Sequence, residues 1–267
     1  MKNEIITNKS GLHYLQPVEG DFSFLRDFLE GRMSERGALA FHGWMQRSVR
    51  LIMEADPRNV HLPGQVLIFG GYPAAGKSVI QRYVITPLLG GEAADPTNWI
   101  EDRTDFNRDL VDVHHLCMED PVLSTDPVNR LLFLEKIKQI TTLEDVVIRE
   151  QGKAAGLYPP IWRLSISVNY DREKLKVLPI ISPDVEDKLI ALEIKSKPLP
   201  SVPDEVSNQM EFRSAFRQQL AEALPGYLWW LLNDFEIPAH MRSDRFGVVS
   251  HYDQNILALW PLAECIK

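Results

Sequence analysis

A glycine-rich loop after a short apolar run constrains the fold of this chain more than any other feature. Residues 71 to 78 read GYPAAGKS and fit the pattern G-x-x-x-x-G-K-[ST] without a mismatch. The loop follows the apolar run 65 to 69 (QVLIF), which has the length of a buried strand. A helix is predicted from about Lys77 to the stop at Gly90-Gly91. Strand, loop and helix in this order are the context that a phosphate-binding loop requires.

Each residue type in the loop has a physical reason. Gly71 and Gly76 allow backbone angles and a close approach that a side chain would block, so successive N–H groups can surround a phosphate. Lys77 adds a cation for the β- and γ-phosphates, and the Ser78 hydroxyl can ligate Mg²⁺. We therefore expect ATP and Mg²⁺ here; the alternative is a glycine turn with an incidental lysine. The remaining positions of the loop are Tyr72, Pro73, Ala74 and Ala75.

Polar side chains end two later strand candidates. The apolar run 116 to 118 ends in the adjacent carboxylates Glu119 and Asp120, and the run 161 to 168 ends at Asn169. A carboxylate at a strand end can hold Mg²⁺ or polarise the attacking water, and an amide can hydrogen-bond that water or the γ-phosphate. Spacing leaves open which carboxylate has which role. The alternatives are a solvated acidic turn and an asparagine that begins a turn, but the order of the three motifs favours a catalytic site.

The alternation of strands and helices predicts the fold class. We expect an α/β P-loop NTPase core with a mainly parallel sheet. A helical N-terminal segment is predicted over residues 1–60, the ATPase core over 61–198 and a helical C-terminal subdomain over 199–267. Within the last part, the pattern predicts one helix around Met210 to Leu220 and another around Tyr227 to Leu232.

Composition narrows the functional class. The chain has 267 residues, 29 basic and 37 acidic side chains and a formal net charge of −8, which argues against a protein that coats nucleic acid. Its two cysteines, Cys117 and Cys265, are too few for a disulfide scaffold. The low cysteine content indicates a reducing cytoplasm. Because no apolar run reaches the roughly 20 residues that span a bilayer, we expect a soluble protein without a membrane partner.

Several segments resemble the superfamily 3 helicases of viruses, phages and mobile elements, a branch of the AAA+ ATPases. The resemblance is to the helicase part of phage-type primase-helicase proteins. It covers about residues 35 to 260. The segments that carry it are GGYPAAGKS (70–78), TDFNRDL (104–110), HHLCMED (114–120), WRLSISVNYDREKLKVLP (162–179) and, more weakly, LWWLLNDFEIPAHMRSDRFG (228–247).

This resemblance implies an ATP-hydrolysing, ring-forming motor, usually a homo-hexamer, that translocates on single-stranded DNA and separates a duplex during replication of a phage or mobile element. By motif matching, Lys77 and Ser78 are the Walker A residues, Glu119 and Asp120 the Walker B carboxylates, and Asn169 the sensor asparagine. An arginine from a neighbouring subunit is expected to complete each site. The candidates, for each of which an ordinary surface arginine is the alternative, are Arg172, Arg242 and Arg245.

A basic window within this acidic chain suggests where DNA would bind. Residues 149 to 176 contain six bases and three acids. Residues 152 to 156 (GKAAG) can form a hairpin tip that presents Lys153 to a phosphate backbone, and Lys174 is the second candidate contact. A solvated charged loop is the alternative. The first 60 residues are too few for a primase or origin-binding domain. The expected alternatives are a motor that is loaded by such a partner on another chain, a trimmed variant encoded by a mobile element, and an ATPase that no longer unwinds DNA.

Two other functional classes fit parts of the pattern. A P-loop kinase that phosphorylates a small molecule or nucleotide would need an acceptor-binding carboxylate and an arginine-bearing lid rather than a strand-tip asparagine. A nucleotide-dependent assembly module would retain Lys77 but could lose Glu119, Asp120 or Asn169, which are all present. The three motifs together favour the motor.

Overall fold

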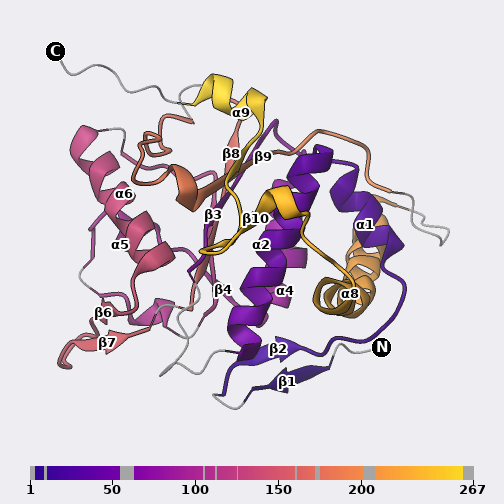
Figure 1. Ribbon diagram of the computed structural model, residues 1–267, viewed down its shortest axis with the longest axis horizontal. Helices are drawn as coiled ribbons and strands as arrows, with labels where there is room; N and C mark the ends of the chain where they lie inside the picture. The colour runs from indigo at the N-terminus through magenta and orange to yellow at the C-terminus, as the bar shows by residue number, and fades with distance from the viewer. Residues whose placement is uncertain are drawn as a thin grey trace.

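A parallel β-sheet forms the centre of the computed structural model, which describes residues 4–8, 11–54, 63–104, 106–111, 113–124, 126–159, 161–171, 175–200 and 208–260 (Figure 1). The six strands follow the order β12-β9-β3-β8-β5-β4, and every neighbouring pair is parallel. Their bounds are β3 Val66–Gly71, β4 Ala93–Ala94, β5 His115–Glu119, β8 Arg163–Asn169, β9 Leu189–Glu193 and β12 His251–Tyr252. The predicted α/β P-loop NTPase core is confirmed.

The apolar side chains of β3 divide between the two faces of the sheet. Leu67 and Phe69 belong to one buried cluster, while Val66 and Ile68 belong to the other. This alternation follows from the two-residue period of a strand. All six residues of β3 are buried, as expected for a central strand of a parallel sheet that is covered on both faces.

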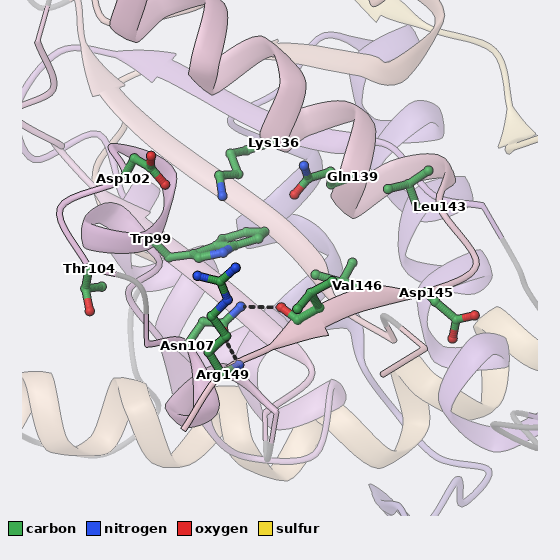
Figure 2. Close-up of a pocket in the computed structure, with 11 residues that line it drawn as sticks. Trp99, Asp102, Thr104, Asn107, Lys136, Gln139, Leu143, Asp145, Val146 and Arg149 are labelled. Atoms are coloured by element: carbon green, nitrogen blue, oxygen red, sulfur yellow. Dashed lines mark hydrogen bonds between the residues drawn. The ribbon is translucent and has the colours of Figure 1, made fainter. Parts of the chain in front are cut away.

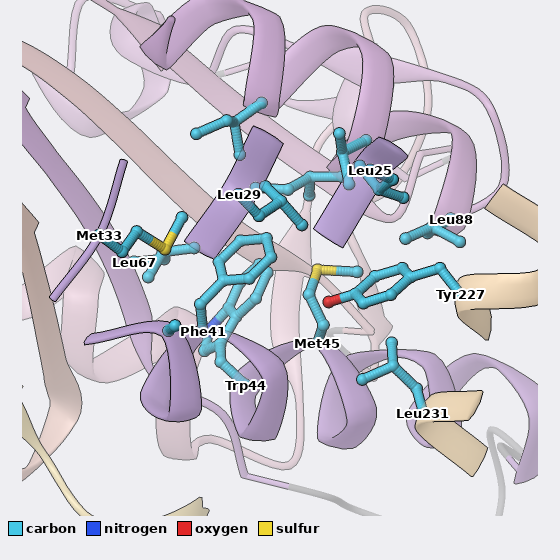
Figure 3. Close-up of a cluster of buried hydrophobic side chains, with 14 of the residues drawn as sticks. Leu25, Leu29, Met33, Phe41, Trp44, Met45, Leu67, Leu88, Tyr227 and Leu231 are labelled. Atoms are coloured by element: carbon cyan, nitrogen blue, oxygen red, sulfur yellow. The ribbon is translucent and has the colours of Figure 1, made fainter. Parts of the chain in front are cut away.

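Helices cover both faces. One face carries α1 (Ser23–Glu30), α2 (Glu35–Glu54) and α8 (Gln209–Asn233), and the opposite face carries α5 (Thr97–Ile100) and α6 (Pro127–Thr142) (Figure 1). Figure 3 shows how the first group packs, with the aromatic and sulfur-containing side chains of α2 between the leucines of α1 and the C-terminal half of α8. The α2 residues in this cluster are Phe41, Trp44 and Met45.

The helix after the P-loop is not a uniform α-helix. It begins as α3 (Lys77–Ile80), widens into the π-helical turn η1 (Gln81–Ile85) and closes as α4 (Thr86–Leu88). The predicted helix therefore has the predicted extent but contains a π-turn, a feature that is frequent at functional sites. Gly90 and Gly91 follow it with positive φ angles of 97° and 90°.

The prediction of two helices between Met210 and Leu232 is wrong, because α8 runs through Pro225 without a break. The carbonyl of Pro225 accepts a hydrogen bond from the Val18 amide. A side chain at Gly226 would place its Cβ 2.7 Å from the carbonyl oxygen of Gly20. The segment before α1 therefore lies directly against α8, and tertiary packing maintains the helix where proline alone would interrupt it.

Short elements complete the described fold. Three two-stranded antiparallel ladders lie outside the central sheet. They pair β1 (Ile5–Thr7) with β2 (His13–Leu15), β6 (Val146–Ile148) with β7 (Gly156–Tyr158), and β10 (Arg242–Ser243) with β11 (Gly247–Val248). The remaining helical elements are η2 (Arg108–Leu110), η3 (Glu186–Lys188), η4 (Ala239–Met241) and α9 (Gln254–Leu259).

β12 returns residues 251–252 to the edge of the central sheet, beyond the point where the sequence predicted only helices. The division into three regions at residues 60 and 198 stays a prediction. Within the described part of the chain, none of the helices has the length and apolar character needed to cross a membrane.

Candidate nucleotide-binding site

The P-loop connects the end of β3 to the start of α3, as predicted. Gly76 precedes α3 with φ 104°, which glycine adopts without strain, and Ala74 also has a positive φ of 62°. Gly71 is needed for a different reason. A Cβ at this position would lie 2.4 Å from the carbonyl oxygen of Ile194, so the close approach is to the protein's own backbone.

The sheet brings the three predicted motifs together at one edge, the one formed by the carboxyl ends of its strands. β8 lies between β3 and β5, and its last residue, Asn169, is paired in register with Gly71. On the other side, Glu119 is paired with Ser167, and the Asp120 amide donates a hydrogen bond of 2.9 Å to the Ser167 carbonyl. Because all three strands run in the same direction, their polar ends meet beside the P-loop.

A chain of hydrogen bonds joins Lys77, Asn169 and Asp120. The Lys77 ammonium donates to the carbonyls of Gly71 and Tyr72, at 2.8 and 3.0 Å, and to Asn169 Oδ1 at 2.9 Å. Asn169 Nδ2 in turn donates to Asp120 Oδ2 at 2.8 Å. These donors and acceptors fix the orientation of the Asn169 amide, since its oxygen faces a cation and its nitrogen a carboxylate.

Burial shapes the electrostatics of Lys77. The residue is only 5% exposed, and desolvation lowers the pKa of its ammonium group, while the negative charge of Asp120 acts in the opposite direction. Asp120 adopts a positive φ of 43°, which is uncommon for a residue with a side chain. A local backbone strain at the end of a strand is typical of functional positions.

The structure distinguishes the two adjacent carboxylates. Asp120 joins the hydrogen-bonded chain to Lys77, whereas Glu119 forms an ion pair with Arg82 of η1. The hydrogen bond from Arg82 to Glu119 and their opposite charges raise the pKa of the Arg82 guanidinium. Arg82 was not among the residues predicted for the site, because its only signal in the sequence is a basic side chain five residues after Lys77 on the predicted helix.

The residues at this edge fit a Mg²⁺ ion that binds together with a nucleotide. Mg²⁺ commonly takes one or two carboxylates and completes its shell with phosphate oxygens and water. Ser78 is exposed on the first turn of α3, and Asp120 is the carboxylate linked to the P-loop lysine. Among the described residues, no group of three or more His, Cys, Asp or Glu side chains could hold a metal by itself. Ser78 and Asp120 therefore suit a metal ion whose remaining ligands are phosphate oxygens and water.

Two of the three candidate trans arginines, Arg242 and Arg245, do not lie beside the P-loop of their own chain. Arg242 donates from Nε to the Ile237 carbonyl at 2.7 Å, and Arg245 lies 3.0 Å from Asp187. Asp187 precedes the first residue of β9, so Arg245 is at the opposite end of the sheet from its own P-loop. Arg172 and Lys174 lie outside the described residues.

Lys153 lies in the turn of the β6–β7 hairpin, where the sequence predicted a hairpin tip. Its side chain is 67% exposed and forms an ion pair of 2.8 Å with Glu150. The side chain of Asn107 contacts this hairpin at β6 and at the residue that follows β6. Its Nδ2 atom donates a hydrogen bond to the Val147 carbonyl at 3.1 Å, and its Oδ1 atom accepts one from the Arg149 backbone amide at 2.8 Å. Contact of Lys153 with DNA stays a prediction.

A cavity of about 410 Å³ lies beside this hairpin, away from the P-loop (Figure 2). Figure 2 shows Lys136 above the Trp99 ring and Arg149 below it, and the Lys136 ammonium is 4.3 Å from the ring centroid. Asp102 and Asp145 line the same cavity, so its charges balance. Because Trp99 packs on Trp162, which precedes β8, the cavity is at the other end of the sheet and is separate from the nucleotide site.

Comparison with known proteins supports the fold. No protein-family model and no curated protein matches the sequence. Two apo structures of the C-terminal region of NrS-1, one of residues 305–718 and one described as the A form, align over 97% of this chain with TM-scores of 0.63 and 0.59 and identities of 13% and 14%. This chain spans 58% and 57% of those chains. At such low identity the likeness shows a shared fold alone.

A JCV helicase structure also aligns, at 14% identity over 75% of this chain and 58% of that chain. Its TM-score of 0.37 is too low to carry an argument.

Proposed function

We propose that this chain is the ATP-hydrolysing motor of a superfamily 3-type DNA helicase that acts in replication of a phage or mobile element. The observation that carries the proposal is the hydrogen-bonded chain from Lys77 through Asn169 to Asp120. It links the P-loop to a carboxylate through an amide on the intervening strand. An ATPase requires this set of groups, since it must bind phosphate, hold Mg²⁺ and orient water in one place.

The proposed roles follow from the contacts. Lys77 and the loop amides bind the phosphates, while Ser78 and Asp120 hold Mg²⁺, which neutralises charge on the phosphate oxygens. Glu119 lies one residue from Asp120 but is not part of the Lys77 chain, so it is the carboxylate available to polarise water once it separates from Arg82. Asn169 orients that water or the γ-phosphate. An arginine from a neighbouring subunit completes the site within a hexameric ring.

The DNA partner is proposed from the hairpin and from the motif resemblance. The β6–β7 hairpin projects Lys153 at the end of the sheet that is opposite the P-loop. One cation per subunit is sufficient for a channel contact, because a ring repeats it symmetrically. The proposed ring holds single-stranded DNA in its channel and acts with a primase or origin-binding partner.

The decisive experiment measures ATP turnover with and without single-stranded DNA, together with the particle mass in the presence of ATP. Lys77→Ala is expected to abolish turnover, whereas Lys197→Ala, which removes an exposed lysine, is the matched control. DNA-stimulated turnover in a six-chain particle supports the motor. A monomer that ignores DNA and transfers phosphate to an added nucleoside or sugar would refute the motor and favour a P-loop kinase.

A further inference from the structure

A second concave site lies between α2 and the β10–β11 hairpin. This cavity has a volume of about 380 Å³, within the range of small-ligand sites. Three arginines line it: Arg47 and Arg50 from α2, and Arg242 from β10. Neither the nucleotide site nor the hairpin at Lys153 uses Arg47 or Arg50.

The aliphatic part of the Arg47 side chain packs against Gly247. Gly247 has a φ of 82°, and a Cβ there would lie 3.2 Å from Arg47 Cδ, so the arginine stem fits closely against this glycine. At its far end, Arg47 Nη2 donates to the Arg245 carbonyl at 3.3 Å. The Arg47 Nε atom is buried and has no hydrogen-bond partner in the described structure. The side chain is thus positioned by packing, and it lines the cavity.

The charge of Arg47 lacks a counterion in the described part of the chain. Burial lowers the pKa of its guanidinium, and the nearby charge of Arg50 lowers it further, while Glu54 acts in the opposite direction without forming an ion pair. Arg47 also disfavours the charged form of buried Arg163, whose pKa is lowered to about 9 mainly by desolvation. A partly desolvated cation among like charges is unfavourable unless an anion binds beside it.

Acidic groups at the cavity balance only part of this positive charge. Glu236, whose side chain is 86% exposed, forms an ion pair of 3.6 Å with Arg242, and Asp244 is also exposed. Both carboxylates are exposed, whereas Arg47 is partly buried, so solvent screens the charge of Arg47 less than it screens theirs. The planar fork of a guanidinium matches the oxygens of a phosphate, and several arginines around one concavity reinforce that preference.

We propose that Arg47, Arg50 and Arg242 form a phosphate-binding site separate from the P-loop. The bound group is either a phosphodiester of a single DNA strand or a free phosphate. The DNA source rests on the proposed function, whereas the free-phosphate source does not. Position favours the DNA strand: Leu51, next to Arg50, packs with Ile161 and Tyr158, so this part of α2 adjoins the base of the β6–β7 hairpin.

The test uses the full chain carrying Lys77→Ala, so that the P-loop lysine does not contribute to phosphate binding. The probes are a fluorescent single-stranded oligonucleotide, titrated at several salt concentrations, and inorganic phosphate, titrated by calorimetry. In this background, Arg47→Gln and Arg50→Gln are each expected to weaken one or both probes about three- to tenfold. For the oligonucleotide, losing one phosphate contact should also reduce the salt-dependence slope by about 0.7.

The matched control is Arg213→Gln, which removes the same charge from the exposed surface of α8. An unchanged unfolding midpoint shows that each variant is folded. If Arg47→Gln is unstable, Arg50→Gln alone tests the site, because Arg50 is exposed. Weaker oligonucleotide binding with a shallower salt dependence supports a DNA phosphate as the bound group. Weaker binding of inorganic phosphate, with unchanged oligonucleotide binding, supports a free phosphate. If both variants behave like Arg213→Gln, or neither probe binds, the site is overturned. ATP turnover of the wild-type chain tests the proposed function separately.

Discussion

Acidification should destabilise this protein through two histidines at the start of β5. His115 is fully buried, and its ring nitrogens each lie 2.7 Å from a hydroxyl oxygen, of Thr86 on one side and Ser165 on the other. Desolvation lowers the pKa of His115 from 6.5 to about 3. Desolvation, assisted by the charge of His13, lowers the pKa of buried His114 to about 4.

The sign follows from which state binds the proton first. With a lowered pKa in the folded protein, each histidine takes up a proton in the unfolded chain as the pH falls below about 6.5, and the folded state loses stability from there down to the folded pKa. At pH 5 each histidine should reduce the free energy of unfolding by about 2 kcal/mol. The pair together reduces it by about 4 kcal/mol, a large part of the total stability of an ordinary domain.

Urea unfolding at pH 7.5 and pH 5, followed by tryptophan fluorescence, measures this loss. His115→Gln keeps a polar side chain between the two hydroxyl groups but cannot titrate, so its loss of stability between the two pH values should be about 2 kcal/mol smaller. His240→Gln, which changes an exposed histidine, should retain the wild-type loss. If His115→Gln and the wild type lose the same free energy, buried neutral His115 does not cause the acid sensitivity.

Three further substitutions test other parts of the structure. Asn169→Ala removes the link between the P-loop lysine and the strand-end carboxylate, and should slow ATP turnover about 10²-fold in a steady-state assay. Gly71→Ala forces a Cβ to 2.4 Å from a backbone carbonyl, so it should lower the unfolding free energy by about 2 kcal/mol or more in a denaturant titration. Tyr227→Phe leaves buried His42 without its 2.7 Å partner, and should cost about 1–3 kcal/mol by the same measurement. Wild-type turnover in Asn169→Ala would contradict the proposed role, and Gly71→Ala is compared with Gly156→Ala, whose Cβ would meet nothing within 4 Å.

The sequence was most informative where one local rule determined the structure. The P-loop needs only a strand, a turn and a helix start, and β3 and α3 lie where the motif predicts them. Asn169 and Asp120 required one more step, because their proximity depends on β8 lying between β3 and β5. This strand order places the Asn169 amide on the strand adjacent to the P-loop strand, as the sequence predicted.

Other features depend on contacts that no local pattern records. β12 has only two residues and forms by pairing with β9, so the sequence contains no alternating pattern that would predict it. α8 continues through Pro225 because the chain before α1 packs against that point. Arg82 reaches Glu119 only through the folded arrangement of η1 and β5.

The partners of Lys77 have a consequence for how tightly a nucleotide can bind. Three protein oxygens already accept hydrogen bonds from the ammonium group, so an arriving phosphate competes with them. The free energy of nucleotide binding therefore includes the loss of the protein hydrogen bonds that the phosphate replaces. Removing one competitor should therefore favour the ligand. By this reasoning Asn169→Ala would hold ATP more tightly while hydrolysing it more slowly, a separation of ground-state affinity from turnover that equilibrium dialysis can detect.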